Sequence, residues 1–154
     1  MRVCVIPDTH GLLRPEALER LAGVEHILHA GDIGRAGIVE RLAEVAPVTA
    51  IRGNVDTADR ARVHPERVTV ELSGHVVLMV HDRKALGAGG VPGGVSIVVS
   101  GQSHKPSAGA ESGVLSLDPG SAGPRRFPLP VTLGGLDLGQ AVPSARIVEL
   151  IRTD

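Results

Sequence analysis

Apolar residues in the first third of the chain form short runs that alternate with segments of helical periodicity. The runs at 2–7, 24–31 and 47–53 have the length and β-branched content of buried strands. The segments between them, 15–23 and 37–46, have helical spacing, and the first begins at a proline, which is favoured in the first helical turn. This β-α-β-α-β order predicts a parallel sheet with crossover helices.

The pattern changes in the second part of the chain. Residues 67–80 predict two strands around a Ser-Gly turn, and 94–100 predicts another buried strand. The segment 83–94 predicts a loop or a single helical turn, since each interior glycine costs a helix about 1 kcal/mol relative to alanine. We expect strands of a second, antiparallel region at 112–118, 129–138 and 144–151, separated by turns that contain glycine and proline.

Composition indicates one globular domain, which we take to span residues 1–154. Hydrophobic residues make up 42% of the chain, and Phe127 is its one aromatic residue, so Val, Leu, Ile and Ala must build the core. The formal net charge of −1 and the lack of aromatic residues disfavour nucleic acid as the main partner.

The expected compartment is the cytoplasm. The single Cys4 lies in an apolar strand, which excludes an internal disulfide and suits a reducing compartment. The first strand carries no signal-peptide pattern, and no apolar stretch reaches membrane-spanning length. We therefore expect no membrane partner.

Residues able to bind metal ions directly follow five of the apolar runs. In open α/β sheets, ligands bind beyond the carboxyl ends of the strands, so these polar groups should meet at one edge. They are Asp8, His10, Asp32, Asn54, His81, Gln102 and His104.

Each of these residues also has an ordinary alternative role. Asp8 could cap a helix, Asp32 and Asn54 lie in common turn sequences, and a lone histidine after a strand, such as His81, is more often a surface residue. Their succession at strand ends nevertheless favours a metal site. Carboxylate, imidazole and amide donors suit Mn²⁺, Fe²⁺, Ni²⁺ or Zn²⁺, and the lack of thiolates excludes a sulfur-bound structural zinc here.

The motifs, in their order, resemble those of the calcineurin-like metallophosphoesterase superfamily, and most closely its small YfcE-type phosphodiesterase branch. The similarity runs from residue 1 to about 123 and includes "DTHG" (8–11), "HAGDI" (29–33), "IRGNVD" (51–56), "GQSHKP" (101–106) and "DPGS" (118–121). It implies an α/β fold in which a two-sheet β-sandwich is flanked by helices, in four layers of the order α/β/β/α.

The resemblance also implies two metal sites. The first would be held by Asp8, His10, Asp32 and His104, and Asp32 would bridge to a second, completed by Asn54, His81 and Gln102. Asp32, Asn54 and His81 would thereby be catalytic, because the ions hold the phosphate and activate water. We expect Mn²⁺, with Ni²⁺, Fe²⁺ and Zn²⁺ as alternatives.

Gln102 stands where relatives usually have histidine. A neutral amide oxygen is a poorer donor than imidazole to first-row divalent ions, so we expect the second metal to bind more weakly, with one or two ions per chain.

Other positions also depart from the pattern of relatives. Val55 occupies the place where many larger relatives have a histidine that can protonate the leaving group, and Asp82 replaces the usual glycine. Segment 83–94 replaces a helix, and "DPGS" begins with aspartate where asparagine is usual. These differences bear mainly on how a substrate approaches.

Several basic residues and one further histidine are candidates for secondary roles. Arg52, Lys105 and Arg126 could contact substrate phosphate, although each could equally be a solvated surface residue. His29 could orient a metal ligand, or simply be buried and hydrogen-bonded.

The leading hypothesis is a divalent-metal-dependent phosphodiesterase that hydrolyses a small phosphodiester with metal-activated water. The alternative is a catalytically impaired scaffold that binds other proteins, because the superfamily includes a retromer subunit that resembles one. A third option is a single-metal hydrolase in which Gln102 positions water or substrate. A homodimer could form through a sheet edge at 129–138, unless the monomer covers that edge.

Overall fold

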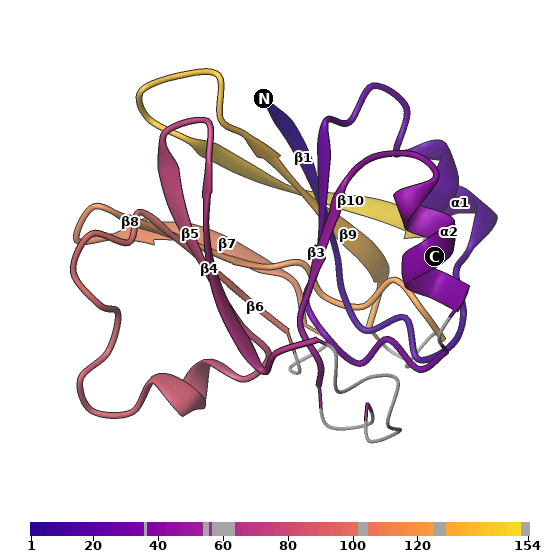
Figure 1. The fold of residues 1–154 in the computed structure, drawn as a ribbon, viewed down its shortest axis with the longest axis horizontal. Coiled ribbons are helices and arrows are strands. Elements are labelled where there is room, and N and C mark those ends of the chain that lie inside the picture. Colours follow the sequence, from indigo (N-terminus) through magenta and orange to yellow (C-terminus); the bar gives the residue numbers. More distant parts are fainter. Residues whose placement is uncertain (36, 54–55, 57–63, 102–104, 125–128, 152–154) are drawn as a thin grey trace.

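The computed structural model describes residues 1–35, 37–53, 56, 64–101, 105–124 and 129–151. Two five-stranded sheets form the molecule (Figure 1). The first sheet has the order β10-β9-β1-β2-β3, in which β1, β2 and β3 are parallel and β9 pairs antiparallel with both β1 and β10. Its strands are β1 (Arg2–Ile6), β2 (His26–His29), β3 (Val48–Ala50), β9 (Val131–Asp137) and β10 (Ser144–Ile151).

The second sheet has the order β4-β5-β6-β8-β7, with β5, β6 and β8 parallel and both edge strands antiparallel to their neighbours. Its strands are β4 (Arg67–Leu72), β5 (His75–Val80), β6 (Ile97–Ser100), β7 (Ser107–Glu111) and β8 (Val114–Asp118). The β4–β5 and β7–β8 hairpins turn at Ser73-Gly74 and Ser112-Gly113. All four of these residues have positive φ, as a two-residue type I′ turn requires.

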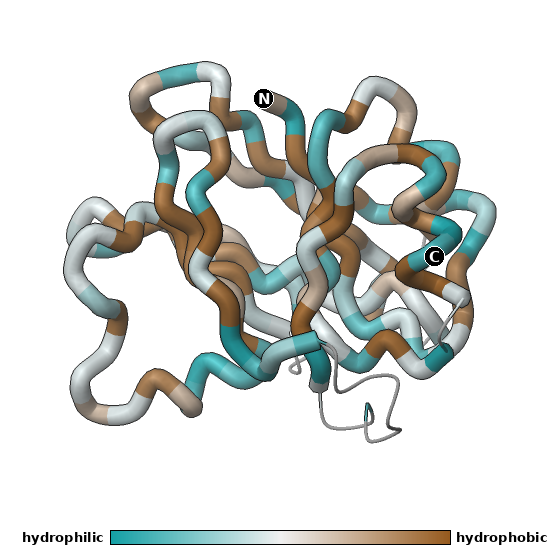
Figure 2. The backbone as a smooth tube through the Cα atoms, in the orientation of Figure 1, coloured by the Kyte–Doolittle hydropathy of each residue, from teal (hydrophilic) through white to brown (hydrophobic). Residues whose placement is uncertain are grey.

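The core lies in two layers, one between the sheets and one beneath the helices. The inner layer includes Val5 and Leu28 of the first sheet and Met79 and Val99 of the second. Helices α1 (Pro15–Glu19) and α2 (Gly37–Ala43) cover the outer face of the first sheet. Figure 2 shows the hydrophobic residues concentrated along the strands.

The outer face of the second sheet has a thin cover. Segment 83–94 begins with the 3-10 helix η2 (Arg83–Leu86), which confirms the predicted single turn, and continues as a glycine-rich loop. Arg83 Nη1 donates a hydrogen bond to Ser116 Oγ of β8 at 2.7 Å. The predicted fold class, an α/β protein with a two-sheet sandwich flanked by helices, is confirmed, although the fourth layer is only this 3-10 turn among the described residues.

The strands expected at 112–118, 129–138 and 144–151 are present, but they do not form an antiparallel region of their own, so that part of the prediction is wrong. Strand β8 pairs parallel with β6 inside the second sheet, whereas β9 and β10 complete the first sheet beside β1. Strand β9 is therefore covered on both sides and offers no free edge for a homodimer. Strand β7 was not predicted, because its sequence SAGAE has no apolar run and all five residues are exposed.

The described residues contain no helix that is both long enough and apolar enough to cross a bilayer.

Candidate metal centre

The loops that follow β1 and β2 run side by side and continue the parallel pairing of the two strands. Asp8 N donates to Gly31 O at 3.2 Å, His10 N to Asp32 O at 2.8 Å, and Gly11 N to Ile33 O at 2.8 Å. These bonds fix the backbone on which three of the predicted ligands stand.

All three of these ligands have strained backbones. Asp8, His10 and Asp32 have φ values of 38°, 46° and 54°, in the left-handed region that residues other than glycine rarely adopt. Such conformations cost of order 1–3 kcal/mol each and persist only where the surroundings hold them. The loop–loop hydrogen bonds provide that support.

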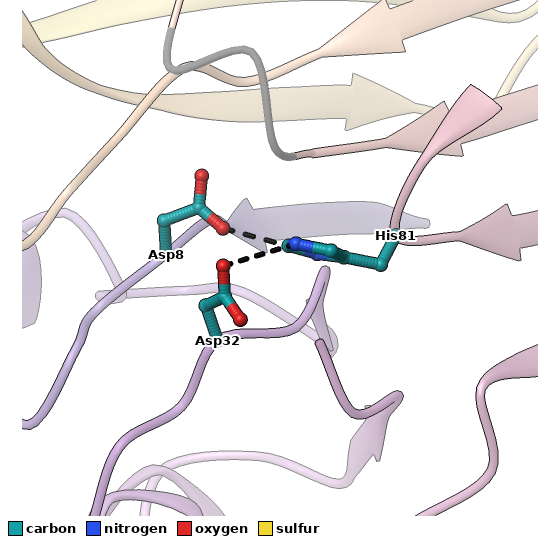
Figure 3. Close-up of side chains that lie close together, drawn as sticks. All are labelled: Asp8, Asp32 and His81. Atoms are coloured by element: carbon teal, nitrogen blue, oxygen red, sulfur yellow. Dashed lines mark ion pairs between the residues drawn. The ribbon is translucent and has the colours of Figure 1, made fainter. Parts of the chain in front are cut away.

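Carboxylates from the first sheet meet an imidazole from the second (Figure 3). His81 Nε2 lies 3.0 Å from Asp32 Oδ2, and His81 Nδ1 lies 3.9 Å from Asp8 Oδ1. One ligand atom from each of Asp8, Asp32 and His81 lies within 4.8 Å of the others, and all three residues are buried. His10 Nε2 lies 3.7 Å from Asp32 Oδ2.

A backbone carbonyl sets the orientation of His81. Its Nδ1–H donates to Ala30 O at 2.9 Å, which directs Nε2 toward Asp32, an arrangement typical of metal-binding histidines. Burial alone would lower the pKa of His81, but the hydrogen bonds to Asp32 and Ala30 and the charges of Asp32 and Asp8 raise it to about 9. The cluster therefore favours a cation at this position.

Two glycines allow the loops to close around the cluster. A Cβ atom on Gly53 would lie 2.3 Å from Asp32 Oδ1, and one on Gly31 would lie 2.6 Å from His81 Nδ1. Since real Cβ atoms do not approach so closely, the glycines of the "GD" and "GN" motifs are required by space at the site.

His29 links the two ligand loops through a buried chain of hydrogen bonds. Gly31 N donates to His29 Nδ1 at 3.2 Å, His29 Nε2 donates to Thr9 Oγ1 at 3.0 Å, and Thr9 Oγ1 donates to Ile33 O at 2.8 Å. Burial is the main cause that lowers the pKa of His29 to about 4, so its ring is neutral at pH 7. His29 is thus buried and hydrogen-bonded, and it braces the loops that carry Asp8 and Asp32.

Asp56 is a structural residue that the sequence analysis missed. Its carboxylate accepts hydrogen bonds from Ile33 N and Gly34 N at 3.0 Å each and from Gly53 N at 2.9 Å. It therefore joins the loop after β2 to the turn after β3. The signal was present in "IRGNVD", but a carboxylate beside a turn looks like an ordinary cap.

Arg35 was also missed. Its side chain lies along Gly11, where an added Cβ would be 3.1 Å from Arg35 Cγ and 3.3 Å from Nε. The residue is exposed and extends beside the backbone that follows His10. No sequence motif marks this arginine.

The remaining predicted site residues differ in what the structure says of them. Asn54, Gln102, His104 and Arg126 lie outside the described residues, so their roles stay predictions. Arg52 Nη2 donates to Glu66 Oε1 at 3.2 Å, and Lys105 is exposed.

Asp82 has a local structural role. Its Oδ1 accepts a hydrogen bond from Lys84 N at 3.0 Å and thereby caps η2.

The chemistry of the described cluster suits a first-row divalent ion. Asp8 and Asp32 supply carboxylate oxygens, while His10 and His81 supply imidazole nitrogens, and none of the four is a thiolate. Buried carboxylates need a positive partner, which a divalent ion would provide.

Comparison with known proteins agrees with this geometry. The family model of the calcineurin-like phosphoesterase superfamily domain matches residues 1–141. A probable metallophosphoesterase of Methanocaldococcus jannaschii is 32% identical over 139 residues, which cover 84% of this chain and 72% of that protein.

Three solved structures share the fold. A novel archaeal phosphodiesterase superposes with a TM-score of 0.80 at 21% identity, covering 96% of this chain and 100% of the other. The E. coli phosphoesterase YfcE superposes with a TM-score of 0.72 at 24% identity, covering 98% of this chain and 100% of the other. Wild-type Vps29 of Entamoeba histolytica complexed with zinc superposes with a TM-score of 0.73 at 21% identity, covering 98% of this chain and 100% of the other. With its match to the family and its Asp–Asp–His cluster at the strand ends, the chain belongs to the calcineurin-like phosphoesterase superfamily.

Proposed function

We propose that this protein is a metal-dependent phosphodiesterase that hydrolyses small phosphodiesters. The observation that carries the proposal is the buried convergence of Asp8, Asp32 and His81 at the carboxyl ends of strands from both sheets. Membership of a phosphoesterase superfamily gives the reaction class, and the archaeal phosphodiesterase of the same fold supports the choice of diester.

The described residues would hold a divalent ion in a fixed place. Asp8, His10 and Asp32 would supply donors to the first ion, with His104 as its further proposed ligand. Asp32 and His81 would supply donors to the second ion, and the Ala30 carbonyl keeps His81 Nε2 directed at that site. When bound, a divalent ion stabilises charge on the phosphate and lowers the pKa of a water molecule. We propose Mn²⁺ as this ion, with Ni²⁺, Fe²⁺ and Zn²⁺ as alternatives.

The second metal site is proposed to be weak. Asn54 and Gln102 would complete it with His81 and the bridging Asp32, and the amide of Gln102 replaces the usual imidazole. Metal analysis of protein purified without chelators should find one ion per chain and a second at partial occupancy. Two tightly held ions would contradict this part of the proposal.

Cations near the strand ends would offset the charge of the substrate. Arg52, Lys105 and Arg126 are proposed to contact the phosphate, and Arg35 joins them because its side chain lies beside Gly11, next to His10. Arg52 already pairs with Glu66, so phosphate would have to compete for it. Replacing Arg35 with glutamine should raise the KM for a diester more than it lowers kcat.

A chromogenic bis-aryl phosphodiester tests the main proposal. Purified protein with Mn²⁺ should release the phenolate, and Asp32→Asn should abolish release because it replaces a buried, negatively charged metal ligand with a neutral amide. Glu44→Gln, which removes an exposed carboxylate that follows α2 and pairs with Arg41, is the matched control and should keep full activity. Equal rates from the wild type and Asp32→Asn would refute the proposal.

The second candidate function is a scaffold for protein–protein interaction. It is favoured by Gln102 and by the shared fold with Vps29, a similarity that by itself shows the fold alone. Gln102→His separates the possibilities: a weakened two-metal enzyme should gain turnover, and a scaffold should stay inactive. If the wild type is active and Gln102→His has the same activity, a single-metal hydrolase in which Gln102 positions water or substrate would be favoured.

The cytoplasm remains the proposed location, supported by the buried, unpaired Cys4.

A further inference from the structure

Three arginines surround a small cavity on the helix side of the first sheet. Arg2 comes from β1, Arg20 from the end of α1 and Arg146 from β10, and the cavity has a volume of about 130 Å³. Its lining otherwise consists of Val3, Cys4, Val24, Leu133, Gly134, Gly135 and Val148. No carboxylate belongs to this lining.

Strand register brings the arginines together. Cys4 pairs with Gly135, and Gly135 pairs with Arg146, so these three residues form one row across β1, β9 and β10. Because side chains alternate along a strand, Arg2 stands on the same face of the sheet as Cys4. The fold therefore places these arginines over one patch of sheet.

Two glycines make room for the arginine side chains. A Cβ atom on Gly135 would lie 3.0 Å from Arg146 Cζ, and one on Gly23 would lie 3.0 Å from Arg2 Nη1. The guanidinium group of Arg146 thus lies directly over the glycine backbone of β9. Any other residue at position 135 would have to displace it.

The positive charges are not neutralised within the described part of the chain. There, the guanidinium groups of Arg2, Arg20 and Arg146 form no hydrogen bond to an acceptor and no ion pair. Asp137 is opposite Arg2 in register, but its Oδ1 accepts a hydrogen bond from Gly139 N at 3.0 Å. All three arginines are exposed, so an anion in the cavity could reach their guanidinium groups.

The site is distinct from the metal centre. Cys4 lies inside β1 and Asp8 lies two residues beyond its end, so at the rise of a β-strand the two are separated by up to about 13 Å. Burial raises the pKa of the Cys4 thiol to about 12, so it is neutral at pH 7. The arginines are therefore the charged groups of the cavity.

We infer that this cavity is a binding site for the phosphate group of a small ligand, separate from the metal centre. Planar guanidinium groups match the oxygens of phosphate and form charge-assisted hydrogen bonds with them. The volume equals that of roughly four water molecules, which suits one phosphate group but not a whole nucleotide. The ligand is either free phosphate or a phosphate ester whose remainder lies outside the cavity.

Calorimetric titration with inorganic phosphate, in chelator-treated protein so that the metal centre does not contribute, tests the inference. The wild type should bind one phosphate per chain at millimolar concentrations or below. Arg146→Gln and Arg20→Gln should each weaken binding about tenfold or more, since each removes charge-assisted hydrogen bonds. Arg41→Gln, an exposed arginine on α2 that pairs with Glu44, is the control and should bind like the wild type.

Further ligands identify the source and the specificity of the anion. Phenyl phosphate binding in competition with inorganic phosphate would support a phosphate ester as the ligand, whereas exclusion of phenyl phosphate would support the free ion. Acetate should bind more weakly than either. Absence of saturable binding, equal weakening by Arg41→Gln, or acetate binding as tightly as phosphate would each overturn the inference. Arg146→Gln changes β10 and Arg20→Gln changes the end of α1, so the two are independent. A variant that melts at the same temperature as the wild type is folded, and its loss of phosphate binding can then be assigned to the missing guanidinium group.

Discussion

The strand-end cluster and the cover of the second sheet are built on opposite principles. At the cluster, buried ligands have strained backbones, and glycines are required because an added Cβ would touch a ligand. In segment 83–94, the glycines at 87, 89, 90, 93 and 94 have open space around them. Glycine therefore permits close approach in the first region, whereas in the second it meets no neighbouring atom and serves only the positive φ of Gly87, Gly90 and Gly94. Substitutions should be costly in the first region and, at Gly89 and Gly93, whose φ is not positive, mild in the second.

The largest effect is expected from Asp56→Ala. This change leaves Ile33 N, Gly34 N and Gly53 N without their acceptor. Each of these N–H groups that stays buried without a partner costs about 1–3 kcal/mol of stability. We expect a loss of about 3–5 kcal/mol in the free energy of unfolding, measured by urea denaturation, together with weaker metal binding. The control Asp137→Ala removes one exposed acceptor, that of Gly139 N, and should cost less than about 1 kcal/mol. Similar losses from both variants would show that Asp56 does not brace the site.

A matched pair of glycine substitutions compares the two regions directly. Gly53→Ala should cost about 1–3 kcal/mol and weaken metal binding, because its Cβ would push on Asp32 Oδ1. Gly89→Ala meets nothing within 4 Å and should change stability by no more than about 0.5 kcal/mol. Differential scanning calorimetry and Mn²⁺ titration check both. If the two variants melt alike, the contrast drawn above is wrong.

The brace formed by His29 makes stability depend on pH. Its pKa is about 4 in the folded state and near 6.5 when unfolded, so only the unfolded chain takes up this proton as the pH falls below 6.5. Stability is fully present above pH 6.5 and should fall by about 2 kcal/mol between pH 6.5 and 5. Urea denaturation at several pH values measures this slope. His29→Gln, which does not titrate, should show a smaller slope, and an equal slope would assign the effect to other groups.

The smallest effect is expected where the cover meets the second sheet. Arg83→Ala removes the exposed hydrogen bond to Ser116, which contributes about 0.5–1 kcal/mol at most. Thermal melting should shift slightly, and diester hydrolysis should not change. A loss comparable to that of Asp56→Ala would mean that this thin layer supports the fold more than its contacts indicate.

The sequence predicted the strands whose apolar pattern is strong and the strand ends at which Asp8, Asp32 and His81 meet. Periodicity reports which face of a strand is buried, but it carries no information on lateral neighbours. The pairing of β8 with β6 and of β9 with β1 therefore could not be inferred. Strand β7 lacks an apolar signal because it is an exposed edge. Asp56 and Arg35 act through backbone contacts across distant segments, which only the folded chain reveals.

Anomalous diffraction from crystals soaked in Mn²⁺ tests the central claim most directly, since it locates the ion without relying on activity. The account predicts a peak within coordination distance of Asp8, His10 and Asp32, a weaker peak next to Asp32 and the Nε2 atom of His81, and the loss of both in Asp32→Asn. A well-ordered cluster with no peak under these conditions, or a peak bound elsewhere on the molecule, would contradict it.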